Sequence, residues 1–291
     1  MRIAVFGNIY RTVIISHIKV MCDFFRNKDA VILLEKKLYD FVREHDEVCL
    51  GNTEIIEDDN FDADMVFSIG GDGTFLNTAA HIGRKQIPVL GINTGRLGFL
   101  SDISSEDILL ALESIENKQY TIEERSLIQL EIGDGNELEH PYALNEVSVQ
   151  KQDSSSMISI NVSINGHMVH TYQADGLVVS TPTGSTAYSM SVGGPIVVPQ
   201  AQNFILSPVA SHSLTVRPLI VPDSWTIELE VFSRSGSFLM ALDGRSKVLE
   251  QKTKLCISKA DFPVRIVKLK NHTFFNTLKN KLLWGVDKRN G

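Results

Sequence analysis

The chain has 291 residues, 43% of them hydrophobic, and its 28 basic and 35 acidic residues give a formal net charge of −7. This length suits one large domain or two ordinary ones, and the hydrophobic share argues against a disordered chain. The acidic balance argues against general nucleic-acid binding, which requires a basic surface. No apolar run is long enough to span a membrane and the N-terminal segment is too quickly polar for a signal peptide, so we expect a cytoplasmic protein without a membrane partner. Cys22, Cys49 and Cys256 lie far apart and are expected to be reduced, mostly buried thiols.

The first 120 residues predict strands that alternate with helices. Short apolar runs typical of buried strands occupy 2–6, 30–34, 64–68 and 87–92. Helical spacing of apolar residues occurs at 13–25, around 38–42, and at 75–82 and 104–117. Strands that alternate with helices indicate βαβ units and a mostly parallel sheet.

Beyond about residue 120 the pattern changes to short alternating runs, which predict a β-rich second domain at roughly 121–270. Strands are expected at 127–132, 143–149, 158–164, 167–172, 213–216, 226–232, 237–241 and 253–257. Asn165-Gly166 between two such runs is a strong hairpin signal. One helix is expected near 185–192, and the segment 274–284 has the apolar face of another.

The turn Gly70-Gly71-Asp72-Gly73-Thr74 joins an expected strand to an expected helix. Glycines let another molecule approach the backbone, and the free N–H groups at a helix start favour an anion. Asp72 is unusual there, because a carboxylate repels phosphate unless it binds a metal or takes up a proton, and this indicates phosphoryl-transfer chemistry. The alternative is a tight turn in which Asp72 only caps the helix. The turn matches neither the GxGxxG nor the GxxxxGK[ST] fingerprint.

Other stretches also offer polar groups. Asn145-Glu146 interrupts an apolar strand, where it could bind sugar hydroxyls or mark a bulge or an exposed edge. The run 175–189 places many hydroxyl residues after an apolar strand, which is typical of a phosphate or ribose pocket, although excess capping hydroxyls are the alternative. The loop 93–99 is either a binding loop with Phe99 against a base or a packed loop, and 242–245 fits a hairpin turn. The histidines have no carboxylate partner at metal-binding spacing, so no metal ligand is expected among the protein side chains.

Together these motifs resemble those of the bacterial type of NAD kinase. The resemblance covers nearly the whole chain and rests on Gly70–Thr74, Gly91–Leu100, Asn145–Glu146 and Asp175–Ser189. It implies a Rossmann-like parallel α/β domain of residues 1–120 that binds nucleotide, a β-sandwich-like NAD-binding domain at 121–270, and a final helix by which residues 271–291 return to the first domain. It also implies transfer of the γ-phosphoryl group of ATP to the 2′-hydroxyl of the adenosine ribose of NAD, giving NADP, in a cytoplasmic homodimer or homotetramer that uses ATP with a divalent cation, Mg²⁺.

The resemblance assigns roles to residues. Asp72 would be the general base, and Gly73 with its neighbours would receive phosphates. Asn145 and Glu146 would hold NAD through its ribose and phosphate region, with Asp175 near the nicotinamide. The remaining expected substrate contacts are Asn77, Phe99 at the adenine, Gln173, Thr183, Thr186, Ala187, Tyr188, Ser189, Met190, Ser191, Ala210 and Arg245.

Some positions depart from the family pattern, and other functions compete with this one. Ser154-Ser155-Ser156, Gln173 and Arg245 replace residues that touch phosphates in relatives, which bears on the choice between NAD and NADH and on the phosphoryl donor. Diacylglycerol kinases share a similar glycine-rich turn, so a lipid kinase is the second hypothesis. A non-catalytic NAD(H) sensor is the third, and a hydride-transferring oxidoreductase fits worst because no GxGxxG fingerprint is present.

Overall fold

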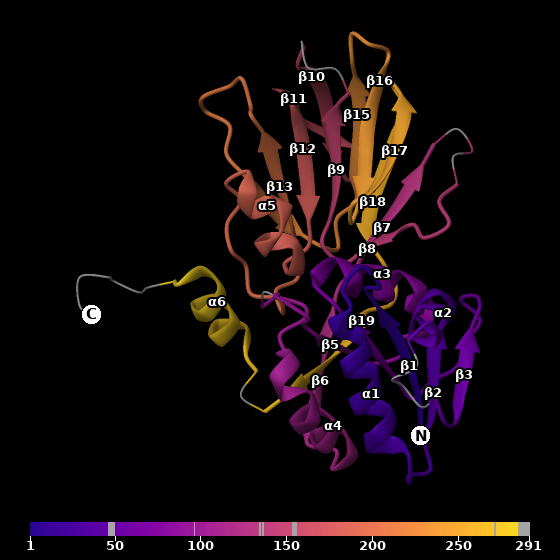
Figure 1. Cartoon of the computed structure of the whole chain (residues 1–291). Coiled ribbons are helices and arrows are strands. Elements are labelled where there is room, and N and C mark those ends of the chain that lie inside the picture. The colour runs from indigo at the N-terminus through magenta and orange to yellow at the C-terminus, as the bar shows by residue number, and fades with distance from the viewer. Residues whose placement is uncertain are drawn as a thin grey trace. The chain divides into compact units, whose positions relative to one another are not determined.

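The structure is a computed structural model that describes residues 1–45, 50–95, 97–133, 135, 137–152, 156–270 and 272–284. Cys49, Arg96, Ser154 and Ser155 therefore lie outside the described residues. The chain divides into two compact units, one of residues Met1–Glu124 with Val264–Gly291 and one of Arg125–Pro263, rather than dividing at 120 and 270 (Figure 1). Among the described residues, no helix is both long and apolar enough to cross a membrane.

The first unit contains a seven-stranded sheet in the order β3-β2-β1-β4-β5-β19-β6. Its strands are β1 (Arg2–Gly7), β2 (Val31–Glu35), β3 (Thr53–Ile56), β4 (Met65–Ile69), β5 (Val89–Ile92), β6 (Tyr120–Arg125) and β19 (Val264–Leu269). The pairs from β3 through to β19 are parallel, which confirms the predicted parallel sheet. The sequence pattern missed β3 and β6, and β19 joins this sheet although residues 264–269 were expected in the second domain.

Helices cover both faces of this sheet. They are α1 (Val13–Phe25), α2 (Lys36–Arg43), α3 (Asp72–Ile82) and α4 (Ile108–Glu116), with short 3₁₀ turns at Gly83–Lys85 and Ser105–Asp107. The last helix, α6 (Phe274–Leu282), follows β19 in the chain. Val5 of β1 belongs to the apolar cluster formed with α1, α2 and α4. The next residue, Phe6, points to the opposite face because side chains alternate along a strand, and its ring stacks on His81 of α3 at 5.5 Å.

The second unit contains two six-stranded antiparallel sheets, in the orders β11-β10-β15-β18-β7-β8 and β14-β13-β12-β9-β16-β17. The strands are β7 (Ile128–Ile132), β8 (Tyr142–Ala143), β9 (Glu146–Lys151), β10 (Ile158–Ile164), β11 (His167–Ala174), β12 (Gly176–Ser180), β13 (Asn203–Val209), β14 (Leu219–Pro222), β15 (Ile227–Phe232), β16 (Ser237–Leu242), β17 (Arg245–Glu250) and β18 (Lys254–Lys259). A 3₁₀ turn at Thr183–Thr186 and the short helix α5 (Tyr188–Ser191) replace the longer helix expected at 185–192.

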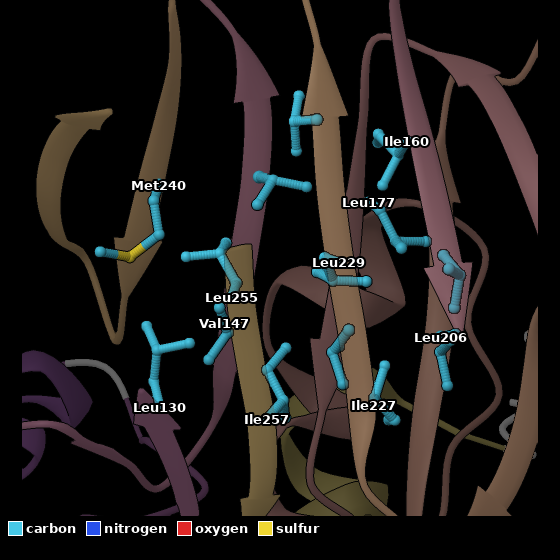
Figure 2. Packing of buried hydrophobic residues seen from close by; sticks show 14 of the residues in the cluster. Leu130, Val147, Ile160, Leu177, Leu206, Ile227, Leu229, Met240, Leu255 and Ile257 are labelled. Carbon is cyan, nitrogen blue, oxygen red and sulfur yellow. The ribbon is translucent and has the colours of Figure 1, made fainter. Parts of the chain in front are cut away.

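The core of the second unit lies between its two sheets, where alternate residues of each strand meet (Figure 2). Leu229 comes from one sheet, and Val147 and Met240 come from the other. This packing confirms the predicted β-sandwich-like domain. Asn165 and Gly166 both have positive φ values, 50° and 77°, as the predicted hairpin between β10 and β11 requires.

The strand predicted at 213–216 is wrong. Residues 213–216 form a turn, and Leu214 is 90% exposed, so the apolar residue in this run has no core to face. Arg217 instead donates hydrogen bonds to the carbonyls of Leu214 and Val216, both at 2.8 Å. Strands β13, β14 and β17 were not predicted.

Candidate active site

The glycine-rich turn lies between the end of β4 and the start of α3, as predicted. The backbone N–H of Gly70 donates to the carbonyl of Ile92 at 2.8 Å, and a Cβ at Gly70 would lie 2.2 Å from Oγ1 of Thr74. Close packing therefore requires glycine at this position. A Cβ at Gly71 or Gly73 would meet nothing within 4 Å, so these two residues face open space.

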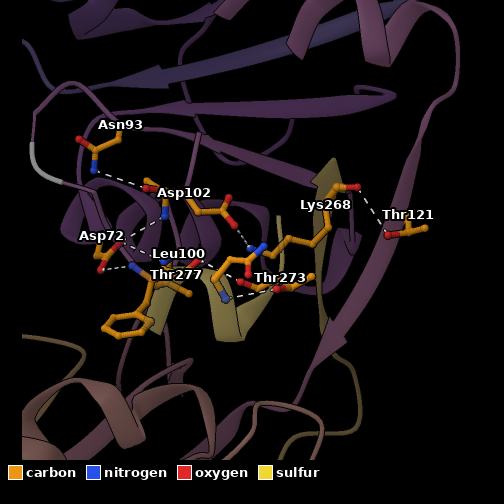
Figure 3. A network of polar contacts seen from close by, with 11 residues as sticks. Asp72, Asn93, Leu100, Asp102, Thr121, Lys268, Thr273 and Thr277 are labelled. Carbon is orange, nitrogen blue, oxygen red and sulfur yellow. Dashed lines mark hydrogen bonds and ion pairs between the residues drawn. The ribbon is translucent and has the colours of Figure 1, made fainter. Parts of the chain in front are cut away.

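The carboxylate of Asp72 is held by a second loop of the first unit, at 97–101 (Figure 3). Its Oδ2 accepts the N–H of Phe99 at 3.0 Å, and its Oδ1 accepts the N–H groups of Leu100 and Ser101 at 3.0 and 3.1 Å. A Cβ at Gly98 would lie 2.0 Å from Oδ1, so glycine there lets the loop close around the carboxylate. The N-cap position of α3 is Gly71 and Asp72 is the first helical residue, and both oxygens of Asp72 accept from the 97–101 loop, so the interpretation of Asp72 as a helix cap is wrong.

A buried ion pair anchors this loop to the sheet. Nζ of Lys268 on β19 lies 2.5 Å from Oδ2 of Asp102, and both side chains are less than 10% exposed. Figure 3 shows the pair next to the contacts of Asp72. An ion pair that is removed from water needs both partners, because either one alone would be an uncompensated buried charge.

A pocket of about 420 Å³ opens beside the glycine-rich turn. It is lined by Asn8, Arg11, Gly71, Gly73, Thr74, Asn93, Thr94 and Gly95, which follow the carboxyl ends of β1, β4 and β5. In the order β3-β2-β1-β4-β5, the chain adds β2 and β3 on one side of β1 and then β4 and β5 on the other side. The pocket therefore lies at the switch point, where the direction of strand addition changes. Open α/β sheets bind their ligands at such a point.

Arg11 supplies a cation to this pocket, although it was not among the site residues predicted from the sequence. Its Nη1 donates to the carbonyl of Thr94 at 3.1 Å, which leaves further guanidinium N–H groups for an anion. Asn93 also lines this pocket, and its Oδ1 accepts the N–H of Gly95 at 2.6 Å. The only signal in the sequence was a basic residue a few positions after the first strand.

In the second unit, the polar pair Asn145-Glu146 precedes and begins β9, and a buried carboxylate holds it in place. Asp243 accepts the backbone N–H groups of Leu144, Asn145 and Glu146 at 2.6, 2.9 and 3.0 Å. Burial, together with the charge of Asp243, raises the pKa of Glu146 from 4.5 to about 8, although a hydrogen bond from the backbone of Tyr188 opposes the shift. Glu146 is therefore protonated at neutral pH.

The hydroxyl-rich run after β12 folds against this pair. Thr181 Oγ1 donates to the carbonyl of Leu144 at 2.5 Å, and a Cβ at Gly184 would lie 2.1 Å from the carbonyl oxygen of Asn145. The turn thereby brings Tyr188 to Glu146, and burial and the Glu146 charge raise the pKa of the Tyr188 hydroxyl. Of the predicted residues here, Thr186, Ala187 and Met190 are half-buried, Ser191 is exposed, and Thr183 and Ser189 are buried. Ser189 is engaged internally, with Ser207 at 3.1 Å.

The remaining predicted residues of the second unit separate into different environments. Asp175 forms an ion pair with Lys151 at 2.8 Å, and Ala210 is exposed with a φ of 46°. Gln173 lines another pocket, of about 460 Å³, together with Ser156. The Arg245 guanidinium donates to the carbonyls of His140, Tyr142 and Leu242, at 2.8, 2.6 and 3.2 Å respectively.

Within the first unit, Asn77 is exposed on α3, one helical turn after Gly73. Phe99 is half-buried against Phe274 of α6, with ring centroids 6.2 Å apart. The histidines do include one with a carboxylate partner, because His81 Nδ1 lies 2.5 Å from Oδ1 of Asp59. Sequence spacing could not reveal this pair, since its members are 22 residues apart.

Comparison with known proteins gives a consistent result across the chain. Residues 25–120 match the family model for the ATP-NAD kinase N-terminal domain, and residues 144–269 match the one for the C-terminal domain. An NAD kinase of Bacteroides fragilis is 48% identical over 99% of this chain and 100% of its own, and one of Porphyromonas gingivalis is 41% identical over 98% of both chains.

Solved structures agree in fold. A yeast NADH kinase complexed with NADH has a TM-score of 0.89 at 19% identity and covers 99% of this chain and 89% of its own. An NAD kinase from Archaeoglobus fulgidus in complex with ATP has a TM-score of 0.74 at 26% identity and covers 97% of this chain and 99% of its own. The chain therefore belongs to the NAD kinase family.

Proposed function

We propose that this protein is an NAD kinase, which transfers the γ-phosphoryl group of ATP to the 2′-hydroxyl of the adenosine ribose of NAD. The observation that carries the proposal is the pocket at the switch point of the first sheet. Gly71 and Gly73, the two neighbours of Asp72, line this pocket, so a phosphate bound there lies next to a fixed carboxylate. Its close relatives are named NAD kinase, and the Archaeoglobus relative was solved with ATP.

The pocket supports ATP binding through its backbone and its cation. Gly71 and Gly73 leave room for phosphate oxygens, and the start of α3 favours an anion. Arg11 adds a charged donor of the type that binds phosphate. The hydroxyl of Thr74 and the amide oxygens of Asn8 and Asn93, which also accept backbone N–H groups, would contribute neutral oxygen ligands to an Mg²⁺ bound with ATP. When bound, Mg²⁺ would neutralise phosphate charge.

Asp72 is the general base in this proposal. A ribose hydroxyl is a poor nucleophile, and a carboxylate within hydrogen-bond reach accelerates its reaction by about 10²–10⁴-fold. The three backbone donors of the 97–101 loop fix the position of the carboxylate before the substrate arrives. Fixed geometry of this kind supplies much of the catalysis in phosphoryl transfer.

The second unit contributes the NAD-binding groups. Because Glu146 is neutral below about pH 8, it can donate a hydrogen bond to NAD without repelling its pyrophosphate. Asn145 and the half-buried surface around Tyr188 complete the proposed set of NAD-binding groups. We also propose that the protein acts in the cytoplasm as a homodimer or homotetramer.

The test incubates the purified protein with ATP, Mg²⁺ and either NAD or NADH. NADP formed from NAD is detected with an NADP-specific dehydrogenase, and NADPH formed from NADH is detected by chromatography. NADP from NAD is the expected result. Diacylglycerol in detergent micelles, with radiolabelled ATP, tests the lipid-kinase alternative in parallel. A protein that binds NAD but forms no phosphorylated dinucleotide would overturn the proposal in favour of a sensor.

A further inference from the structure

The carboxylate of Asp72 has a fourth partner, which comes from the far end of the chain. Nζ of Lys281, on the last turn of α6, lies 3.5 Å from Oδ2 of Asp72. The three backbone N–H groups occupy the other positions around the two oxygens. Since a carboxylate offers about four lone-pair sites, all of them have a donor in this structure.

Three contacts fix Lys281 at this place. Thr273 caps α6 by accepting the N–H of Asn276 at 3.2 Å, and Leu278 is 2% exposed, so the helix is docked by its apolar face. The ring of Phe99 contacts Phe274 of α6, and Nζ of Lys281 lies over the same ring, 4.6 Å from its centroid. A cation over an aromatic face is attracted to it. The same loop that holds Asp72 therefore also holds Lys281.

We propose that Lys281 is a positioning residue for phosphoryl transfer, acting as the exchangeable counter-ion of Asp72. This inference rests on the proposed function. Among the described residues Asp72 has four donors; three belong to the backbone of a packed loop, and Lys281 is the one on a flexible side chain that can move aside. The acceptor hydroxyl takes its place on Oδ2, and the ammonium remains beside the carboxylate.

The counter-ion is required because the reaction brings negative charges together. The 2′-oxygen forms a bond to the γ-phosphorus while the bond to the β,γ-bridging oxygen breaks, ADP leaves with that electron pair, and the hydroxyl proton passes to Asp72. Until the proton arrives, Asp72 is an anion next to the phosphates. A neighbouring ammonium offsets this repulsion, which would otherwise oppose the approach of ATP.

The test compares substitutions at position 281 in the full-length protein. We expect Lys281→Ala and Lys281→Gln to lower kcat/KM for ATP by about 10- to 100-fold, the worth of a charged hydrogen bond, with little change in KM for NAD. Lys281→Arg keeps the charge and is expected to retain most of the activity. Ethylamine in the buffer should partly restore Lys281→Ala, because the side chain is 32% exposed and its place is open to a small cation.

Two controls separate this role from a structural one. Lys279→Ala removes an exposed lysine of the same last turn and should leave the kinetics unchanged. In an Asp72→Asn background, Lys281→Ala should have no further effect, because the charge that it balances is absent. Wild-type activity or higher in Lys281→Ala, or equal losses in Lys281→Arg and Lys281→Ala, would overturn the inference. Absence of NADP formation by the wild type would instead overturn the proposed function.

Discussion

Glu146 binds its proton more tightly in the folded second unit than in the unfolded chain, and replacing Glu146 by Gln removes this titrating group. Burial and the charge of Asp243 raise the pKa of Glu146 from 4.5 to about 8. Between these values the folded protein holds the proton and the unfolded chain has lost it. The stability that Glu146 contributes is therefore fully present below about pH 4.5 and is lost as the pH rises through about 8.

The size of this effect follows from the shift. Raising the pKa of Glu146 from 4.5 to about 8 corresponds to roughly 5 kcal/mol in the free energy of unfolding, at about 1.4 kcal/mol per pKa unit. In a protein of this size that is a change in melting temperature on the order of 10 °C. Gln is uncharged at every pH and has nearly the shape of protonated Glu, so Glu146→Gln should lose the part of the pH dependence that comes from this residue.

The assay is thermal unfolding of the wild type and of Glu146→Gln from pH 5 to pH 9 at constant ionic strength. We expect the wild type to lose more stability than the variant over this range. Burial also raises the pKa of Asp243, so some decline remains in the variant, in the same direction. Glu250→Gln, an exposed position in the same unit, serves as the matched control. Parallel curves for the wild type and Glu146→Gln would refute the reasoning.

Three further predictions concern the first unit. Arg11→Ala should raise KM for ATP by about tenfold or more, the worth of a charged hydrogen bond, while KM for NAD stays constant in steady-state kinetics. Gly98→Ala should lower both kcat and the melting temperature, because the new Cβ would lie 2.0 Å from Oδ1 of Asp72; an unchanged kcat would contradict the role of the 97–101 loop in holding this carboxylate. Lys268→Met should cost about 3–5 kcal/mol in chemical denaturation by leaving Asp102 charged and buried, and adding Asp102→Leu should recover most of the loss.

Much of the fold could be predicted because local patterns and tertiary structure agree. The turn at Asn165-Gly166 and the alternation along β10 specify a hairpin with one buried face, and the structure has both. The strand expected at 213–216 failed because alternation alone does not reveal whether a core lies opposite. Residues 264–269 were expected in the second domain but form β19 of the first sheet, because which sheet a segment joins depends on contacts that are remote in sequence.

The candidate site could also be predicted only in part from the sequence. The turn around Asp72 and the pair Asn145-Glu146 were visible, since glycines and polar residues interrupt apolar runs there. The donors to Asp72 could not be predicted, because three are backbone groups and the fourth, Lys281, is 209 residues away. The raised pKa of Glu146 also depends on Asp243, which the sequence showed only as part of a turn.

The most direct test of the account is NADP formation by the wild type and by Asp72→Asn, with NAD, ATP and Mg²⁺ all saturating. Asn keeps the size of the side chain and one acceptor oxygen, but it cannot take a proton from the ribose hydroxyl. We predict that the variant folds and binds NAD as the wild type does and that kcat falls by about 10²–10⁴-fold, the usual contribution of a general base. A kcat near that of the wild type would contradict the role of Asp72 on which the account depends.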